Sequence, residues 1–151
     1  MITNTYLYHY TNEDLLGYLL LEKRISENIL TNSRIKSNPF VWLTTSPTTE
    51  GLGLKMGGKN SPVIKITVKG QNHYERWKTW YVRNGIEKDE IIDLEHGRNP
   101  DTWFISEKEV SPSDIIKIEN IKTGIVYYTQ QNGVNEEAWN KWTDEDINEY
   151  I

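Results

Sequence analysis

The pattern of apolar and polar residues predicts a series of short strands. β-Branched and aromatic residues gather in runs that end at turn-forming residues, which is typical of strands. T-W-F-I-S and D-I-I-K-I-E-N-I are two examples. The predicted strands are residues 5–9, 40–45, 63–68, 102–106, 114–121 and 123–130.

Helical spacing occurs in three other parts of the chain. Leucines at 15, 16, 19 and 20 form one helical face, so we expect a helix that Thr11 or Asn12 caps and that stops near Arg24. A second predicted helix carries an aromatic stripe and ends at Gly85; its aromatic residues are Tyr74, Trp77, Trp80 and Tyr81. Residues 135–151 are acidic and helical, and could form two helices divided at Thr143.

The remaining segments indicate loops. Residues 26–38 predict a loop that could hold one short turn or strand. The glycine-rich segment that follows Pro47 predicts another loop, and residues 86–102 are charged and irregular. No repeat or interdomain linker interrupts the 151 residues. The chain therefore predicts a single α+β domain, residues 1–151, with an N-terminal helix, an inserted aromatic helix and a C-terminal acidic helix.

Charge and composition narrow the classes of function. Residues 1–70 hold eight basic and five acidic residues, and residues 71–151 hold nine and seventeen. The acidic second half argues against extended nucleic-acid wrapping. The basic excess of the first half could bind a phosphate-bearing ligand, or could be solvated surface charge. With no cysteine, no export signal and no membrane-spanning run, we expect a cytoplasmic protein.

Common catalytic and metal motifs are absent from the sequence. There is no G-x-S-x-G motif and no cysteine nucleophile. The histidines at 9, 73 and 96 lack metal-ligand spacing, so no metal site is predicted. The glycines of G-L-G-L-K-M-G-G-K do not follow the P-loop pattern.

Three short motifs carry the candidate chemistry: Y-H-Y-T at 8–11, L-T-T-S at 43–46 and E-K-E-V-S-P at 107–112. Each has an ordinary structural alternative. His9 could donate to a nearby carbonyl at a strand-to-helix corner, and T-T-S could form a Ser/Thr turn. In an extended chain Glu107 and Glu109 face one side, where repulsion would raise the pKa of one carboxylate.

In this order the motifs resemble those of the ADP-ribosyltransferase superfamily over residues 5–130. The resemblance implies a split β fold that clamps NAD, with His9 on a ribose and backbone near Tyr10 on the nicotinamide amide. Tyr8, Tyr10 or Trp42 would wall the nicotinamide pocket, and Arg24 or Arg34 could meet the pyrophosphate. The residues implied to bind the cofactor are His9, Tyr10, Thr11, Thr44, Thr45 and Ser46.

The same resemblance implies a catalytic role for Glu109, assisted by Glu107, although Glu95 stays an alternative. Its carboxylate would stabilise the oxocarbenium-like ribose that forms as nicotinamide leaves. The expected activity is mono-ADP-ribosylation of a host macromolecule, more readily a protein than a nucleic acid, by a toxin-like or phage-encoded effector. The alternatives are a non-catalytic nucleotide- or protein-binding inhibitor and an NAD glycohydrolase. Trp77 and Trp80, or the acidic tail, could dock a protein partner, but core packing is the alternative for the tryptophans.

Overall fold

A computed structural model describes residues 5–22, 30, 33–35, 38–54 and 61–140. Its elements, in chain order, are β1 (Tyr6–Thr11), α1 (Asp14–Glu22), β2 (Ser33–Ile35), β3 (Asn38–Thr44), β4 (Ile64–Lys69), β5 (Glu75–Arg76), α2 (Trp77–Arg83), α3 (Lys88–Glu95), η1 (Pro100–Thr102), β6 (Trp103–Ser106), η2 (Pro112–Asp114), β7 (Ile115–Asn120), β8 (Val126–Thr129), β9 (Gly133–Val134) and α4 (Glu136–Asn140). The described residues form one small α+β domain, as the sequence predicts.

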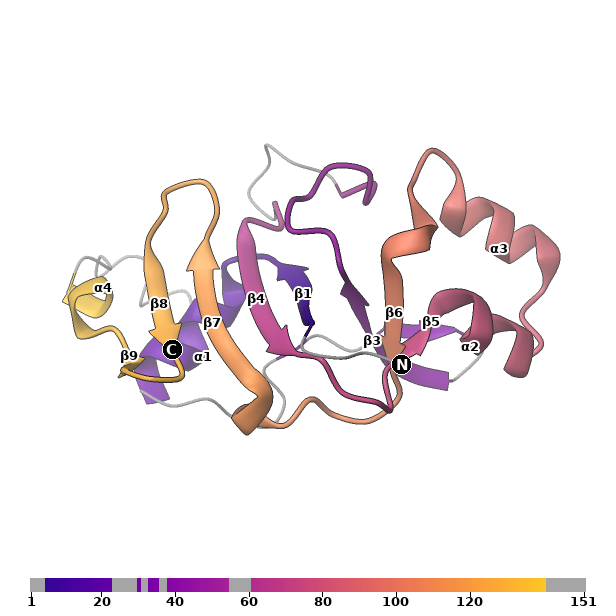
Figure 1. Ribbon diagram of the computed structural model, residues 1–151. Helices are drawn as coiled ribbons and strands as arrows, with labels where there is room; N and C mark the ends of the chain where they lie inside the picture. Colours follow the sequence, from indigo (N-terminus) through magenta and orange to yellow (C-terminus); the bar gives the residue numbers. More distant parts are fainter. Residues whose placement is uncertain (1–4, 23–29, 31–32, 36–37, 55–60, 141–151) are drawn as a thin grey trace.

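The strands form one open sheet in the order β5-β6-β3-β1-β4-β7-β8-β9, and β2 adds to β3 (Figure 1). All strand pairs in the described part of the chain are antiparallel. The first strand therefore lies in the middle of the sheet. This position places the residues of β1 between β3 and β4.

Successive residues of a strand face opposite sides of a sheet, and here both sides hold a hydrophobic core. Val41 and Leu43 of β3 pack with α1 and with the apolar residues of β1, β4 and β7. Phe40 and Trp42 of the same strand belong to the second core, which α2 completes. Because a strand buried on both sides needs apolar residues at successive positions, F-V-W-L lacks polar alternation.

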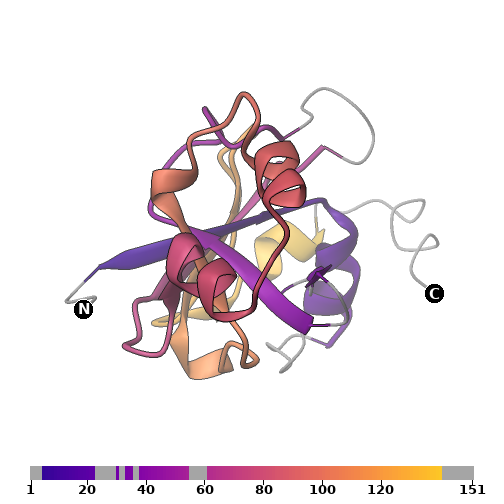
Figure 2. The ribbon, with the colours of Figure 1, turned by 90° about the vertical axis from the view of Figure 1, so that its right-hand side faces the viewer.

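Helix α1 covers one face of the sheet, on the same side as α4 (Figure 2). Leu15, Leu16 and Leu19 are buried there, as their helical spacing predicts. The Asn12 side-chain oxygen accepts the Asp14 N–H over 3.0 Å, so Asn12, not Thr11, caps the helix. Thr11 is still part of β1.

Helices α2 and α3 lie at the other end of the sheet, beside β5 and β6 (Figure 1). Trp77 and Trp80 are almost fully buried, which confirms core packing for the aromatic stripe. Helix α2 begins at Trp77, three residues after Tyr74, and ends before Gly85, whose φ of 61° suits glycine.

The segment 86–102 contradicts its prediction as irregular, because it contains α3 and η1. Ile91 and Leu94 of α3 pack against the second core while the rest of the helix carries charges. Because only these two residues face the core and the others are mostly charged, the hydrophobic periodicity of the helix is weak in the sequence.

The other predicted strands are present with ends shifted by up to three residues. Two predictions lie partly outside the described residues, namely the end of the first helix near Arg24 and the acidic tail beyond residue 140. Within the part of the chain that the structure describes, no helix is long and apolar enough to cross a membrane.

Candidate functional site

The sheet opens between β1 and β3. These strands share one rung, Tyr8 with Thr44, whereas β1 and β4 pair along the whole length of β1. From His9 onward β1 has no ladder partner in β3. The backbone N–H and C=O groups on that edge of β1 therefore form no ladder with β3. A bound ligand can form hydrogen bonds with such groups.

His9 bridges this opening with its side chain. His9 is a residue of β1, and its backbone pairs with Ile66 of β4. It does not lie at the strand-to-helix corner that the sequence indicates. The imidazole Nδ1 lies 2.8 Å from the carbonyl oxygen of Trp42. Because a carbonyl only accepts, Nδ1 must carry the proton and donate. One nitrogen of the ring therefore donates to a nearby carbonyl, which is the structural role that the sequence left open for His9.

The second nitrogen of the ring is buried and has no hydrogen-bond partner in the part of the chain that the structure describes. His9 is 6% exposed, and Nε2 has no hydrogen bond to any described residue. Burial lowers the pKa of His9, and the bond to Trp42 only partly offsets that effect. The ring is therefore neutral at pH 7, and Nε2 presents a lone pair that can accept a hydrogen bond from a hydroxyl or an N–H group.

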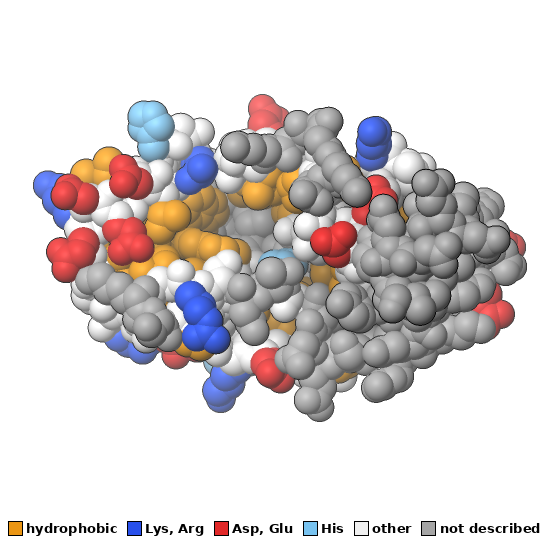
Figure 3. Space-filling view, turned by 180° about the vertical axis from the view of Figure 1, so that it is seen from behind, with side chains coloured by type: hydrophobic (Ala, Val, Ile, Leu, Met, Phe, Trp, Pro, Cys, Tyr) orange, Lys and Arg blue, Asp and Glu red, His pale blue; other side chains and the backbone are white. Residues whose placement is uncertain are grey.

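His9 faces the α1 side of the sheet, the side to which Leu7 also contributes. Figure 3 shows this side of the molecule, with a hollow near its middle and hydrophobic side chains on the flank next to the α2–α3 end. The hollow, the open edge of β1 and the unpartnered nitrogen make this side the best candidate for a ligand site.

Tyr10, Thr44 and Ser46 come together on the opposite side. Thr44 is the rung partner of Tyr8 and so shares its face, and Tyr10 follows by alternation. The Tyr10 hydroxyl donates to the Ser46 carbonyl over 3.0 Å, and burial raises the pKa of Tyr10. These residues, predicted to bind the cofactor, are not brought to His9 by the sheet.

The Thr44 hydroxyl is used within the protein. It accepts the Ser46 N–H over 3.0 Å and donates to Thr102 Oγ1 over 3.0 Å. Ser46 Oγ in turn donates to the Thr48 carbonyl. T-T-S is therefore a Ser/Thr turn, which is the structural alternative for this motif. Thr45 is half-buried and its N–H donates to the Thr102 carbonyl over 2.9 Å.

Glu107 is bound by α2. Its Oε1 accepts from the buried Trp80 indole over 2.8 Å and from Arg83 over 2.6 Å. Arg83 also pairs with Glu75. The bond from Arg83 lowers the pKa of Glu107, so the expected upward shift through repulsion is wrong for this residue. Strand β6 ends at Ser106, so Glu107 and Glu109 lie beyond it.

Glu109 is exposed, and no other described residue forms a hydrogen bond or ion pair with it. Strands β1 and β6 both run antiparallel to β3, so they run parallel to each other. The residues after Ser106, however, lead to the start of β7, where Ile115 pairs with Val68 and so lies beside Leu7, nearer to the Tyr6 end of β1 than to Thr11. Of the two predicted glutamates, Glu109 is the one whose carboxylate contacts no hydrogen-bonding or charged group among the described residues.

Other predicted residues have structural roles. Glu95 ends α3 and accepts from the Trp77 indole over 2.7 Å. The Trp42 ring packs against Phe40, Trp77 and Trp103 rather than in the hollow. Arg34 is exposed on β2, and Arg24 lies outside the described residues.

Sequence reasoning missed the two groups that orient the site, the Trp42 carbonyl and Arg83. Neither gives a signal in the sequence, because a backbone carbonyl has no side-chain identity and Arg83 meets Glu107 across 24 residues. No group of three metal-ligating side chains occurs among the described residues. A comparison of the chain with family models, characterised proteins and solved structures finds no match.

Proposed function

We propose that the chain is an NAD-dependent mono-ADP-ribosyltransferase of the ADP-ribosyltransferase-like superfamily, and that NAD binds at the opening between β1 and β3. The observation that carries this proposal is the His9 ring. One nitrogen donates to the Trp42 carbonyl, and the other is a buried acceptor that no described residue pairs with. A buried polar group normally has a hydrogen bond, and leaving one unpaired costs about 1–3 kcal/mol. A ligand hydroxyl, such as a ribose hydroxyl of NAD, would supply it.

The fold supports a clamp of this kind. The two hydrophobic cores lie on opposite faces, one held by α1 and one by α2, and a single rung joins β1 to β3. A sheet that opens at its centre exposes backbone N–H and C=O groups to a ligand, and such groups hold amides well. In this proposal, the edge of β1 near Tyr10 holds the nicotinamide amide.

Glu109 is the carboxylate that we assign to the chemistry. When the bond between nicotinamide and ribose breaks, its electron pair leaves with nicotinamide and positive charge develops on the ribose. A carboxylate close to that centre stabilises the charge until a nucleophile of the acceptor attacks. Glu107 already accepts hydrogen bonds from Trp80 and Arg83, so we assign it the role of anchoring the segment that carries Glu109. The acceptor is a macromolecule, for which a protein fits the acidic second half of the chain better than a nucleic acid does.

Incubation of the full chain with NAD tests the proposal. We expect release of nicotinamide and, with an acceptor present, a mass gain equal to one ADP-ribosyl group. Glu109→Gln should abolish both while unfolding as the parent does. Lys108→Gln, a neighbouring exposed substitution, is the matched control and should retain activity. Equal turnover by the parent and Glu109→Gln would remove Glu109 from the mechanism.

A second candidate function is NAD binding without turnover. The contacts and exposure of the two glutamates favour this function. Glu107 is held by Trp80 and Arg83, and Glu109 is exposed beyond the end of β6. Such a protein would act as a non-catalytic binder or inhibitor. Saturable NAD binding with no nicotinamide release, in the parent and in Glu109→Gln alike, would select this function over transfer and over hydrolysis.

A further inference from the structure

One face of the sheet carries aromatic and basic side chains and is not covered by a helix of the described chain. Leu7 and His9 of β1 face the α1 side, so Tyr6, Tyr8 and Tyr10 face the other side by alternation. Figure 1 shows α1 behind β4 and β7, with no helix across the front of these strands. The three tyrosines therefore lie on an open face, opposite His9 and the proposed NAD site.

The register of the neighbouring strands places lysines among these tyrosines. Lys69 and Lys65 of β4 pair with Tyr6 and Tyr10. Lys117 of β7 lies one strand further on, on the same face. Because residues directly opposite on adjacent strands share a face of the sheet, the rings and the cations form one surface.

This surface has a net positive charge. Among the residues of β1, β4 and β7, Glu119 is the only acidic side chain on it, and it lies 3.4 Å from Lys117. Lys65 lies over the Tyr8 ring, 4.4 Å from its centroid, and donates to a backbone carbonyl. Lys65 and Lys69 form no ion pair with any described residue, so the surface attracts a negatively charged partner.

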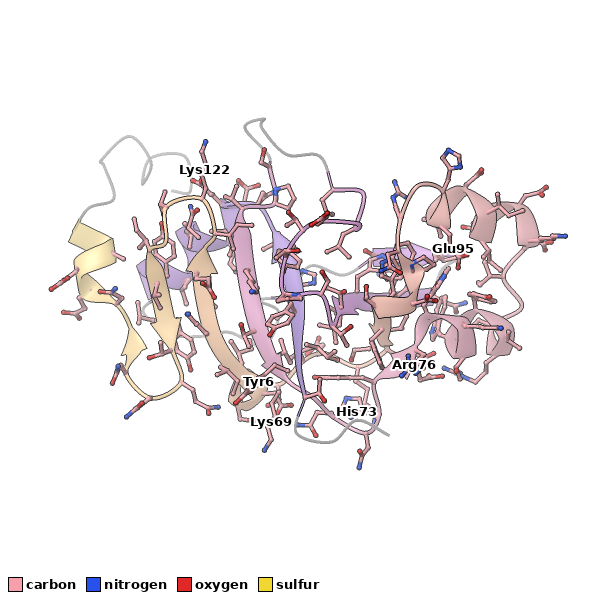
Figure 4. All side chains as sticks on the ribbon, turned by 45° about the horizontal axis from the view of Figure 1, so that its top comes forward. Tyr6, Lys69, His73, Arg76, Glu95 and Lys122 are labelled. Carbon is pink, nitrogen blue, oxygen red and sulfur yellow. The ribbon has the colours of Figure 1, made fainter. Side chains whose placement is uncertain are left out.

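Tyr6 and Lys69 offer a free ring beside a free cation. Tyr6 is 51% exposed, and its ring contacts no aromatic or cationic side chain in the part of the chain that the structure describes. Lys69 is exposed as well. Figure 4 shows both side chains at the same end of the sheet. An exposed ring beside a cation is suited to stack a nucleic-acid base and to contact a phosphate.

We propose that this face binds a short single-stranded nucleic acid. A base stacks on Tyr6, and the phosphates that flank it contact Lys69, Lys65 and Lys117. Tyr10 contributes less, because its hydroxyl already donates to a backbone carbonyl. A duplex keeps its bases stacked on one another, so only a single strand can place a base on Tyr6. The surface spans few strands, so it holds a few nucleotides and needs no extended basic track.

Fluorescence anisotropy of the full chain tests this surface with labelled oligothymidylate and oligouridylate of about five nucleotides, and with a duplex of the same length. We expect saturable binding of a single strand at low salt and much weaker binding of the duplex. With three lysines on phosphates, the slope of log K against log salt should be about −2. Binding of either sugar supports the proposal, and the tighter one identifies the nucleic acid.

Substitutions at Tyr6 separate stacking from general apolar contact. Tyr6→Leu should weaken binding by about tenfold, because the base loses its aromatic platform. Tyr6→Phe keeps the ring and should bind as the parent does. Tyr6 is exposed, so both variants should unfold as the parent does.

Lys69→Gln should weaken binding and reduce the salt slope by about 0.7, the contribution of one phosphate contact to a single strand. Lys122→Gln, at an exposed lysine that Figure 4 shows at the opposite end of the sheet from Tyr6, is the matched control and should leave both unchanged. The proposal is overturned if no single strand binds at millimolar concentration, if the duplex binds as tightly, if Tyr6→Leu binds as the parent does, or if Lys122→Gln loses as much affinity as Lys69→Gln.

Discussion

The Nδ1 atom of His9 and the carbonyl oxygen of Trp42 lie 2.8 Å apart across two strands that share only one rung. The bond replaces the ladder where β1 and β3 separate. It fixes which nitrogen of His9 carries the proton, and so leaves Nε2 as an acceptor. The orientation of this ring, rather than its presence, makes the opening a candidate ligand site.

His9→Asn should weaken NAD binding by about tenfold, the worth of one hydrogen bond. The asparagine amide can reach the Trp42 carbonyl from the position of Nδ1, but nothing replaces Nε2. Calorimetric titration measures the change. His96→Asn, at an exposed histidine, is the control and should bind NAD as the parent does. Unchanged affinity in His9→Asn would separate His9 from the ligand.

The free energy of unfolding should fall as the pH drops below about 6.5, the ordinary pKa of histidine. Burial lowers the pKa of His9 in the folded state, so below this pH the unfolded chain binds a proton that the folded protein does not. Above it both states are neutral and the effect vanishes. Urea titrations from pH 5 to 8, the range of histidine titration, should show a flatter profile for His9→Asn than for the parent. Parallel profiles would contradict a buried neutral His9.

Glu107→Ala should destabilise the fold by about 1–3 kcal/mol, because the buried Trp80 indole loses its acceptor. Glu107→Gln should cost much less, since an amide oxygen still accepts from Trp80 and the lost ion pair with Arg83 is exposed to solvent. Urea unfolding compares the two variants. Equal losses would show that the charge, not the indole bond, supports this segment.

Thr44→Val should destabilise the fold by about 1–3 kcal/mol and leave NAD binding unchanged. The hydroxyl joins the Ser46 N–H to Thr102, and its loss leaves a buried group unpaired. A double-mutant cycle with Thr102→Val should show strong coupling, because the two hydroxyls form one bond. Weakened NAD binding at unchanged stability would instead assign Thr44 to the ligand, as the sequence motif indicates.

Local patterns predicted most of the secondary structure because each depends on neighbouring residues. The leucines of α1 and the Asn12 cap act within one or two helical turns. The run F-V-W-L predicts a buried strand for the same reason. Residues 88–95 were predicted incorrectly, since their two core-facing residues are diluted by charges.

The candidate site was predictable only in part. Motif order selected His9 and Glu109 as candidates, but it gave no sign that Nε2 of His9 is buried without a partner among the described residues or that Glu109 is exposed. Tyr10, Thr44 and Ser46 lie on the opposite face, because the rung from Tyr8 to Thr44 decides the side of the sheet for both strands. A shift of that register by one residue would exchange the faces.

The sequence by itself determined the α+β class, most strands and the apolar faces, because periodicity and turn residues act over a few positions. Only the tertiary structure decided which groups meet. Trp42 orients His9 from 33 residues away and Trp80 engages Glu107 from 27 residues away. Such partners depend on strand order and register, which arise from the packing of the whole sheet and leave no mark in any short stretch of sequence.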